Sequence, residues 1–141
     1  MLFIELRRHL IAMYRTLDRG QGDGSSDSRA LAARLSDSLC ALARSARAKG
    51  LTTYCSLALH VLEQLSSAKR TGYVPVDARS LLKDWVKLSA AYLAAPTNFA
   101  RAAELIEHMG NLRWERPVCR IQRQALLSGL QVETVRRLMS E

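Results

Sequence analysis

The stretch LAARLSDSLCALARSARAKGL, residues 31–51, decides the fold of this chain. Its apolar positions recur every three or four residues, at Leu31, Leu35, Leu39, Leu42 and Ala46. This is the period of an amphipathic helix with one face against a core. Gly50 follows, and glycine commonly ends a helix. The stretch therefore predicts a long helix that stops near Gly50 and is followed at once by another.

Helical periodicity extends in both directions from this stretch. Before it, one face of a first helix is formed by Leu2, Leu6, Leu10, Met13 and Leu17. The loop GQGDGSSDS, residues 20–28, then offers several N-cap candidates. After Gly50 we expect a third helix over residues 52–70. Its inward positions are Tyr54, Cys55, Ala58, Val61, Leu62 and Leu65.

A fourth helix is expected after the turn TGYVPVD, residues 71–77, with Asp77 as its cap. Its inward positions are Leu81, Trp85, Leu88, Tyr92 and Ala95. Pro96 ends this helix, because proline lacks the amide hydrogen and clashes with the preceding turn.

Two shorter patterns complete the chain. Thr97 or Asn98 is the expected cap of a fifth helix, whose inward positions are Phe99, Ala103 and Ile106. Pro117 suits the first turn of a sixth helix. Gly129 leaves open whether that helix continues to Met139 or breaks.

These patterns predict an all-α protein. No alternation typical of a strand appears, and the short connections favour an up-and-down antiparallel bundle. The 141 residues and the hydrophobic fraction of 48% suffice for a real core. We expect about five helices in a bundle over residues 1–110. A further C-terminal helix, within residues 111–141, is expected to pack on or beside it.

Several features indicate a cytoplasmic protein without a membrane span. The first residues, MLFIELRRHL, mix charges with apolar residues and lack the cleavage site of a secretory signal. No apolar run has the length that a membrane helix needs. The cysteines number three and form neither a disulfide framework nor a CxxC metal pattern.

The charge balance favours an acidic partner. The net charge is +8 and the isoelectric point is about 10.0. Nucleic acid, an anionic membrane face and an acidic protein surface all satisfy this balance, and so does a merely solvated basic surface. Nucleic acid is disfavoured because no recognition-helix motif is present and few aromatic residues are suited to stacking on bases.

The second and third predicted helices carry a recognisable pattern. Ser-Ala-Arg at residues 45–47 precedes the pair Gly50-Leu51, and the next helix contains HVLEQL, residues 60–65. Together with TGYVPVDARSLL, residues 71–82, this resembles the histidine phosphotransfer (HPt) domain of the chemotaxis-kinase type. The resemblance implies a helical bundle whose second and third helices carry the phosphotransfer site.

The central residues of that motif are missing. Counting back from Gly50, the phospho-accepting histidine corresponds to Cys40, the motif lysine to Ala43 and its glycine to Arg44. A thiol cannot replace an imidazole in such a relay, alanine supplies no charge, and arginine is bulky where the motif needs a low surface. We therefore expect no phosphotransfer, no enzymatic activity and no cofactor. Cys40 is interpreted as an inert substitution or a reactive thiol.

The predicted site is a patch for binding a partner protein. A helical wheel places Cys40, Ala43, Arg44 and Arg47 broadly on the solvent face of the second helix. On the third helix, His60 and Glu63 also point away from the apolar stripe, so both groups together form one expected patch. In the resembling kinases His60 and Glu63 correspond to residues that support the phospho-accepting histidine. Here they are relics, a docking element, or the site of an alternative, active phosphotransfer at His60.

The second helix carries most of the charge expected at this patch. Its basic residues outnumber Asp37 and are Arg29, Arg34, Arg44, Arg47 and Lys49. We expect them to face a response-regulator receiver domain or a sensor or chemotaxis kinase, or to serve a pilus-type signalling scaffold. A solvated face that only keeps the protein dissolved is the alternative.

The C-terminal segment leaves two interpretations open. Residues 114–141 combine apolar side chains such as Trp114, Ile121 and Leu126 with six arginines in or next to the segment, at 113, 116, 120, 123, 136 and 137. Its apolar side packs against the bundle, or the segment is an amphipathic handle for a partner or a membrane surface.

Overall fold

The all-α prediction is confirmed. The structure is a computed structural model that describes residues 3–19, 25–66, 70, 74 and 76–139. Within these residues there is no strand, and six helices are present. They are α1 (Ile4–Arg19), α2 (Ser25–Ala48), α3 (Thr52–Gln64), α5 (Val76–Ala94), α6 (Phe99–Met109) and α7 (Arg120–Met139).

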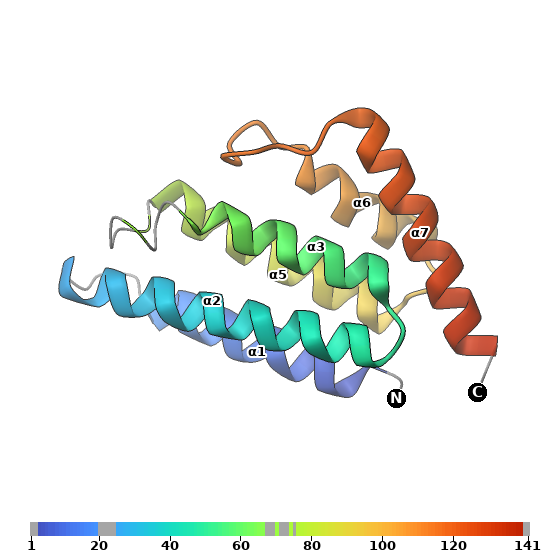
Figure 1. The fold of residues 1–141 in the computed structure, drawn as a ribbon, viewed down its shortest axis with the longest axis horizontal. Coiled ribbons are helices and arrows are strands. Elements are labelled where there is room, and N and C mark those ends of the chain that lie inside the picture. The colour runs from blue at the N-terminus through green and yellow to red at the C-terminus, as the bar shows by residue number, and fades with distance from the viewer. Residues whose placement is uncertain (1–2, 20–24, 67–69, 71–73, 75, 140–141) are drawn as a thin grey trace.

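The helices enclose one shared core. In Figure 1, α2, α3 and α7 lie in front of α1, α5 and α6, and α7 crosses obliquely at one end. Each helix contacts two others: α1 packs against α2, α2 against α3, α3 against α7, α7 against α6, α6 against α5, and α5 against α1. They therefore form a closed ring, in which α7 joins α3 to α6. The C-terminal helix is thus part of the wall around the core.

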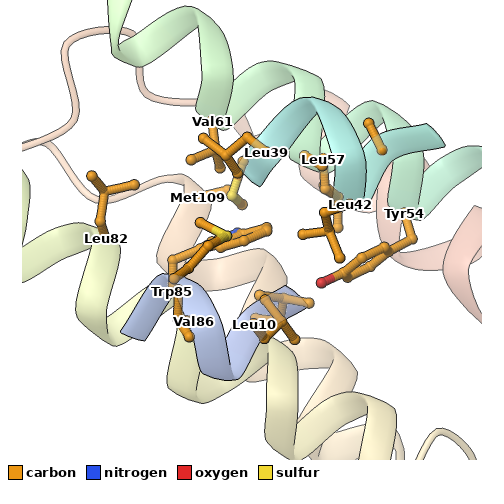
Figure 2. Packing of buried hydrophobic residues seen from close by; sticks show 14 of the residues in the cluster. Leu10, Leu39, Leu42, Tyr54, Leu57, Val61, Leu82, Trp85, Val86 and Met109 are labelled. Atoms are coloured by element: carbon orange, nitrogen blue, oxygen red, sulfur yellow. The ribbon is translucent and has the colours of Figure 1, made fainter. Parts of the chain in front are cut away.

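The predicted stripes of the first two helices are buried. In α1 they are Leu6, Leu10, Met13 and Leu17, and in α2 they are Leu31, Leu35, Leu39, Leu42 and Ala46. Leu2 lies outside the described residues. Figure 2 shows Leu10, Leu42 and Trp85 meeting in the centre of the core. Periodicity alone therefore located the inward face of both helices.

Three aromatic rings join α3 to α5. The rings of Tyr54 and Trp85 stack with their centroids 6.2 Å apart, and those of Tyr54 and Tyr92 with theirs 6.4 Å apart. The hydroxyls of Tyr54 and Ser89 form a buried hydrogen bond of 2.7 Å. Burial raises the pKa of both tyrosines, so each hydroxyl keeps its proton for hydrogen bonding.

Polar contacts fasten α7 to the bundle. Leu51, the N-cap residue of α3, gives no side-chain cap, and the Glu133 carboxylate accepts a hydrogen bond of 2.7 Å from the Thr53 amide instead. The same carboxylate accepts a hydrogen bond from the Thr52 hydroxyl. A buried hydrogen bond also links the hydroxyls of Tyr92 and Thr134. A residue of α7 thus caps a helix that lies 80 positions earlier in the chain.

Gly129 lies inside α7, so the helix continues to Met139. A Cβ atom at this position would lie 2.5 Å from the Thr53 hydroxyl oxygen. The glycine therefore permits close contact between α7 and α3, and it does not break the helix.

Four boundary predictions are wrong, and those at Gly50, Pro96 and Asn98 are confirmed, since α2 ends at Ala48 and α5 at Ala94. α2 begins at Ser25, within the expected loop, and α3 ends at Gln64, six residues early, because Leu65 closes it with a tight turn. α5 begins at Val76, which makes Asp77 a helical residue, and α7 begins at Arg120, after Pro117. The confirmed cap is Asn98, whose side chain accepts a hydrogen bond of 3.0 Å from the Ala100 amide.

The inward face of α6 differs from the expected one. Phe99 is exposed, and the buried residues are Ala102, Leu105, Ile106 and Met109. Ile106 is buried as expected and Ala103 is half-buried, whereas Phe99 is exposed in the first turn of α6, although it lies only three residues before Ala102.

His108 and Trp114 hold the segment after α6. The two rings meet edge to face with centroids 5.6 Å apart, and the Trp114 indole donates a hydrogen bond of 2.9 Å to the His108 carbonyl. Both His108 ring nitrogens are buried without a hydrogen-bond partner among the described residues. Burial therefore lowers the pKa of His108, although the nearby Asp84 carboxylate opposes this shift.

We predict that Glu133→Ala lowers the free energy of unfolding by about 1 kcal/mol, the usual cost of removing a helix cap. The loss is measured by urea unfolding. Glu104→Ala, which removes an exposed carboxylate from α6, is the control and leaves stability nearly unchanged. Equal stability of wild type and Glu133→Ala would contradict the capping role.

We predict that His108 makes the protein less stable in mild acid. Its pKa is lowered in the folded chain, so near the ordinary histidine pKa of about 6.5 the unfolded chain binds the proton more readily. This contribution to stability is present above that value and is lost as the pH falls toward the lowered pKa. Unfolding measured on either side of about pH 6.5 therefore shows a smaller drop for His108→Gln than for wild type. An identical drop in both proteins would refute this role.

Candidate partner-binding site

The outer face of α2 is basic. Arg34, Arg44 and Arg47 are exposed, and none of them forms an ion pair with any residue that the structure describes. Cys40, one turn before Arg44, is half-buried. The predicted exposure is therefore found for Arg44 and Arg47 and only partly for Cys40.

The predicted exposure of Ala43 is wrong, because its exposed fraction is 3%. Ala43 lies four residues after Leu39 and three before Ala46, and both neighbours are fully buried. This spacing puts all three on the same face of the helix. The wheel placed Ala43 broadly opposite the leucine stripe, whereas its spacing to Leu39 and Ala46 puts it on the buried side. Ala43 belongs to the core and leaves the candidate site.

Two other charges of the predicted patch are not part of the exposed group. The Lys49 ammonium lies 3.4 Å from the Glu5 carboxylate of α1. The side chain of Arg29 lies outside the described residues. The basic face of α2 that the structure describes is therefore defined by Arg34, Arg44 and Arg47, with the exposed Asp37 as a nearby acidic residue.

His60 lies against the segment that leads into α7. Its Nε2 atom is 3.0 Å from the carbonyl oxygen of Arg116. The amide nitrogen of Gln64 donates to the same carbonyl at 3.0 Å, and the Gln64 side-chain oxygen accepts a hydrogen bond of 2.9 Å from the Arg116 amide. Gln64 thus grips the Arg116 backbone with two hydrogen bonds, and His60 adds a third.

This arrangement engages one nitrogen of the imidazole. The Arg116 carbonyl oxygen accepts a hydrogen bond from His60 in the tautomer that carries the proton on Nε2, and the Gln64 side-chain nitrogen also lies 3.1 Å from that atom. In that tautomer Nε2 has no free lone pair for attack on a phosphoryl group. Glu63 is exposed at the protein surface. The described contacts tie His60 to residues 111–119 and do not join it to the arginines of α2.

A hollow of about 280 Å³ borders His60, between α3 and α7. It is lined by Ser56, Leu57, His60, Val118, Gln122, Ala125 and Leu126. Most of these side chains are apolar, and His60 is the only ionisable residue among them. The hollow thus has no pair of acid and base groups of the kind that a hydrolytic site uses.

Sequence reasoning missed Gln64 and Arg116, which position His60. Gln64 looks like an ordinary polar residue near a helix end, and Arg116 contributes only its backbone. Nothing local marks a contact between residues 52 positions apart, so no pattern along the chain would have revealed it.

No group of three or more histidine, cysteine or acidic side chains able to hold a metal ion occurs among the described residues. In that same part of the chain, no helix combines the length and apolar character needed to cross a membrane. Comparison with protein-family models, curated proteins and solved structures finds no match for this chain.

We predict that Gln64→Ala speeds hydrogen exchange of the Arg116 amide by roughly tenfold, since a lost buried hydrogen bond costs about 1.4 kcal/mol. Exchange is followed residue by residue by NMR. Glu63→Ala, which changes the exposed neighbour, is the matched control and leaves that amide protected. Equal protection in wild type and Gln64→Ala would refute the grip on Arg116.

Proposed function

We propose that this chain is an HPt-like signalling protein that does not transfer phosphate and acts by binding another protein. In this role it is a scaffold, adaptor or inhibitor in the bacterial cytoplasm, within a two-component or chemosensory pathway. Its partner is a receiver domain or a sensor or chemotaxis kinase, recognised through the basic face of α2.

The observation that carries the proposal is the exposure of Arg34, Arg44 and Arg47 without ion pairs within the described residues. Unpaired guanidinium groups keep all their donors for an incoming carboxylate and suit bidentate recognition. A receiver domain carries clustered carboxylates at its phosphorylation pocket. Charges at the rim of such an interface speed association and select the partner.

The chemistry of the residues argues against phosphate transfer. Cys40 stands at the position of the phospho-accepting histidine, and its thiol lacks the imidazole nitrogen that such a relay uses. His60, the alternative acceptor, has its Nε2 engaged by the Arg116 carbonyl. Both features favour docking over catalysis.

We predict that receiver domains from the same genome bind this protein in a salt-sensitive manner, and that the double variant Arg44→Ala/Arg47→Ala binds roughly tenfold more weakly. The reason is the loss of two rim charges, each worth somewhat less than 1 kcal/mol. Affinity is measured by titration calorimetry at low and high salt.

The matched control is Arg15→Ala/Arg101→Ala, which removes two exposed arginines from α1 and α6 and leaves binding unchanged. If both double variants bind equally, or if neither a receiver domain nor a sensor or chemotaxis kinase from that genome binds, the proposal is wrong. A stable phosphoryl label on wild type that is absent from His60→Ala would instead establish active phosphotransfer.

A further inference from the structure

The outward face of α7 carries a regular stripe that is apolar except for Ser128. Its exposed members are Ile121, Ala125, Ser128, Val132, Val135 and Met139. Successive members are four, three, four, three and four residues apart. This alternation keeps a narrow seam along one side of a helix and is the heptad spacing of paired helices. The stripe runs the length of α7, about 30 Å at 1.5 Å per residue.

The stripe is separate from the side of α7 that faces the bundle. Leu130 and Thr134 are buried there, and Leu126 and Leu127 pack against the core. On the opposite side, 79% of Ile121 and 81% of Met139 are exposed, with 50% of Val132 and 47% of Val135. A helix that only closes a bundle carries polar residues on its outer face. In Figure 1, α7 lies at the edge of the molecule.

The sizes of these side chains indicate what covers them. Small residues, Ala125 and Ser128, lie in the first half of the stripe, and larger ones, Val132, Val135 and Met139, in the second. An antiparallel copy of α7, centred near residue 130, sets Ala125 against Val135 and Ser128 against Val132. Each small residue thus meets a larger one, as close packing requires. A parallel copy would set alanine on alanine and leave gaps.

The residues beside the stripe are compatible with a second copy. Gln122, Gln124 and Gln131 flank it and carry no charge. The two-fold antiparallel alignment brings Arg136 beside Gln122 of the second copy, on the same side of the stripe, so these flanking positions bring no two arginines together. The seam therefore avoids like-charge contacts that would oppose self-association.

We propose that α7 is a self-association helix, which pairs two copies of this chain in an antiparallel, two-fold symmetric dimer. The same patch on each copy forms such an interface. α2 does not contact α7 within the chain, so we expect the dimer to leave the basic face of α2 open on both copies. The inference does not depend on the proposed partner of α2.

The test is sedimentation equilibrium of the full chain from micromolar to several hundred micromolar, at low and high salt. Wild type is expected to dimerise reversibly, and more tightly at high salt, because salt screens the repulsion between two molecules of net charge +8. Val135→Glu is expected to weaken the dimer roughly tenfold or more, because it buries an unpaired charge. Ile11→Glu, at a position with a similar exposed fraction of 48% on α1, is the matched control and leaves the dimer intact.

A second measurement tests the antiparallel alignment. Ala125→Glu and Val135→Lys each abolish dimerisation alone, and an equal mixture restores a heterodimer. The reason is that the carboxylate introduced in one variant then faces the ammonium introduced in the other. Circular dichroism checks that every variant is folded.

The proposal is overturned if wild type is monomeric over the whole concentration range, even if another molecule is found to bind α7. It also fails if Val135→Glu dimerises like wild type, if Ile11→Glu alone loses the dimer, or if high salt weakens association. If the mixture of Ala125→Glu and Val135→Lys forms no heterodimer, the antiparallel alignment is wrong. Binding of a receiver domain to α2 weakens with salt, so the two proposals fail separately.

Discussion

The packing of Tyr54 against Trp85 and Tyr92 is the contact on which the rest of the structure depends. It joins α3 to α5 across the core. The Tyr54 hydroxyl, the polar group of this ring, is hydrogen-bonded to the Ser89 hydroxyl. Burying the Tyr54 hydroxyl without a partner would cost a few kcal/mol. The aromatic packing is therefore favourable only when α3 and α5 are aligned so that this hydroxyl reaches Ser89. With α3 and α5 aligned, the positions of α2 and α6 follow from their short connections.

The last helix is held in a different way. α7 packs through Leu130 and Thr134, and it also supplies the Glu133 carboxylate that α3 needs at its start. Gln64 holds the preceding segment by its backbone at the other end of α3. Both ends of α3 thus depend on residues from the last quarter of the chain. His60 contacts this same segment, whereas the family resemblance implied that it supports the residue at the phospho-acceptor position, Cys40.

The two outer surfaces differ in chemistry. The face of α2 offers cations without described ion pairs, which act over a distance and are screened by salt. The face of α7 offers apolar side chains in a regular seam, which act at contact and tolerate salt. α2 and α7 are not in contact, so both faces can be occupied together. A binding module with two such surfaces would present a pair of basic faces to its partner.

The sequence by itself determined the helical class, the inward faces of α1 and α2, and the cap at Asn98, because these follow from spacing and hydrogen bonding within a few residues. The helical wheel misassigned Ala43, although the distance of this residue from Leu39 along the sequence indicates burial. Only the tertiary structure decided the surroundings of His60, the cap of α3 and the course of α7 through Gly129. Each of these joins groups more than 50 residues apart, and no local pattern records which distant backbone will lie opposite a given side chain.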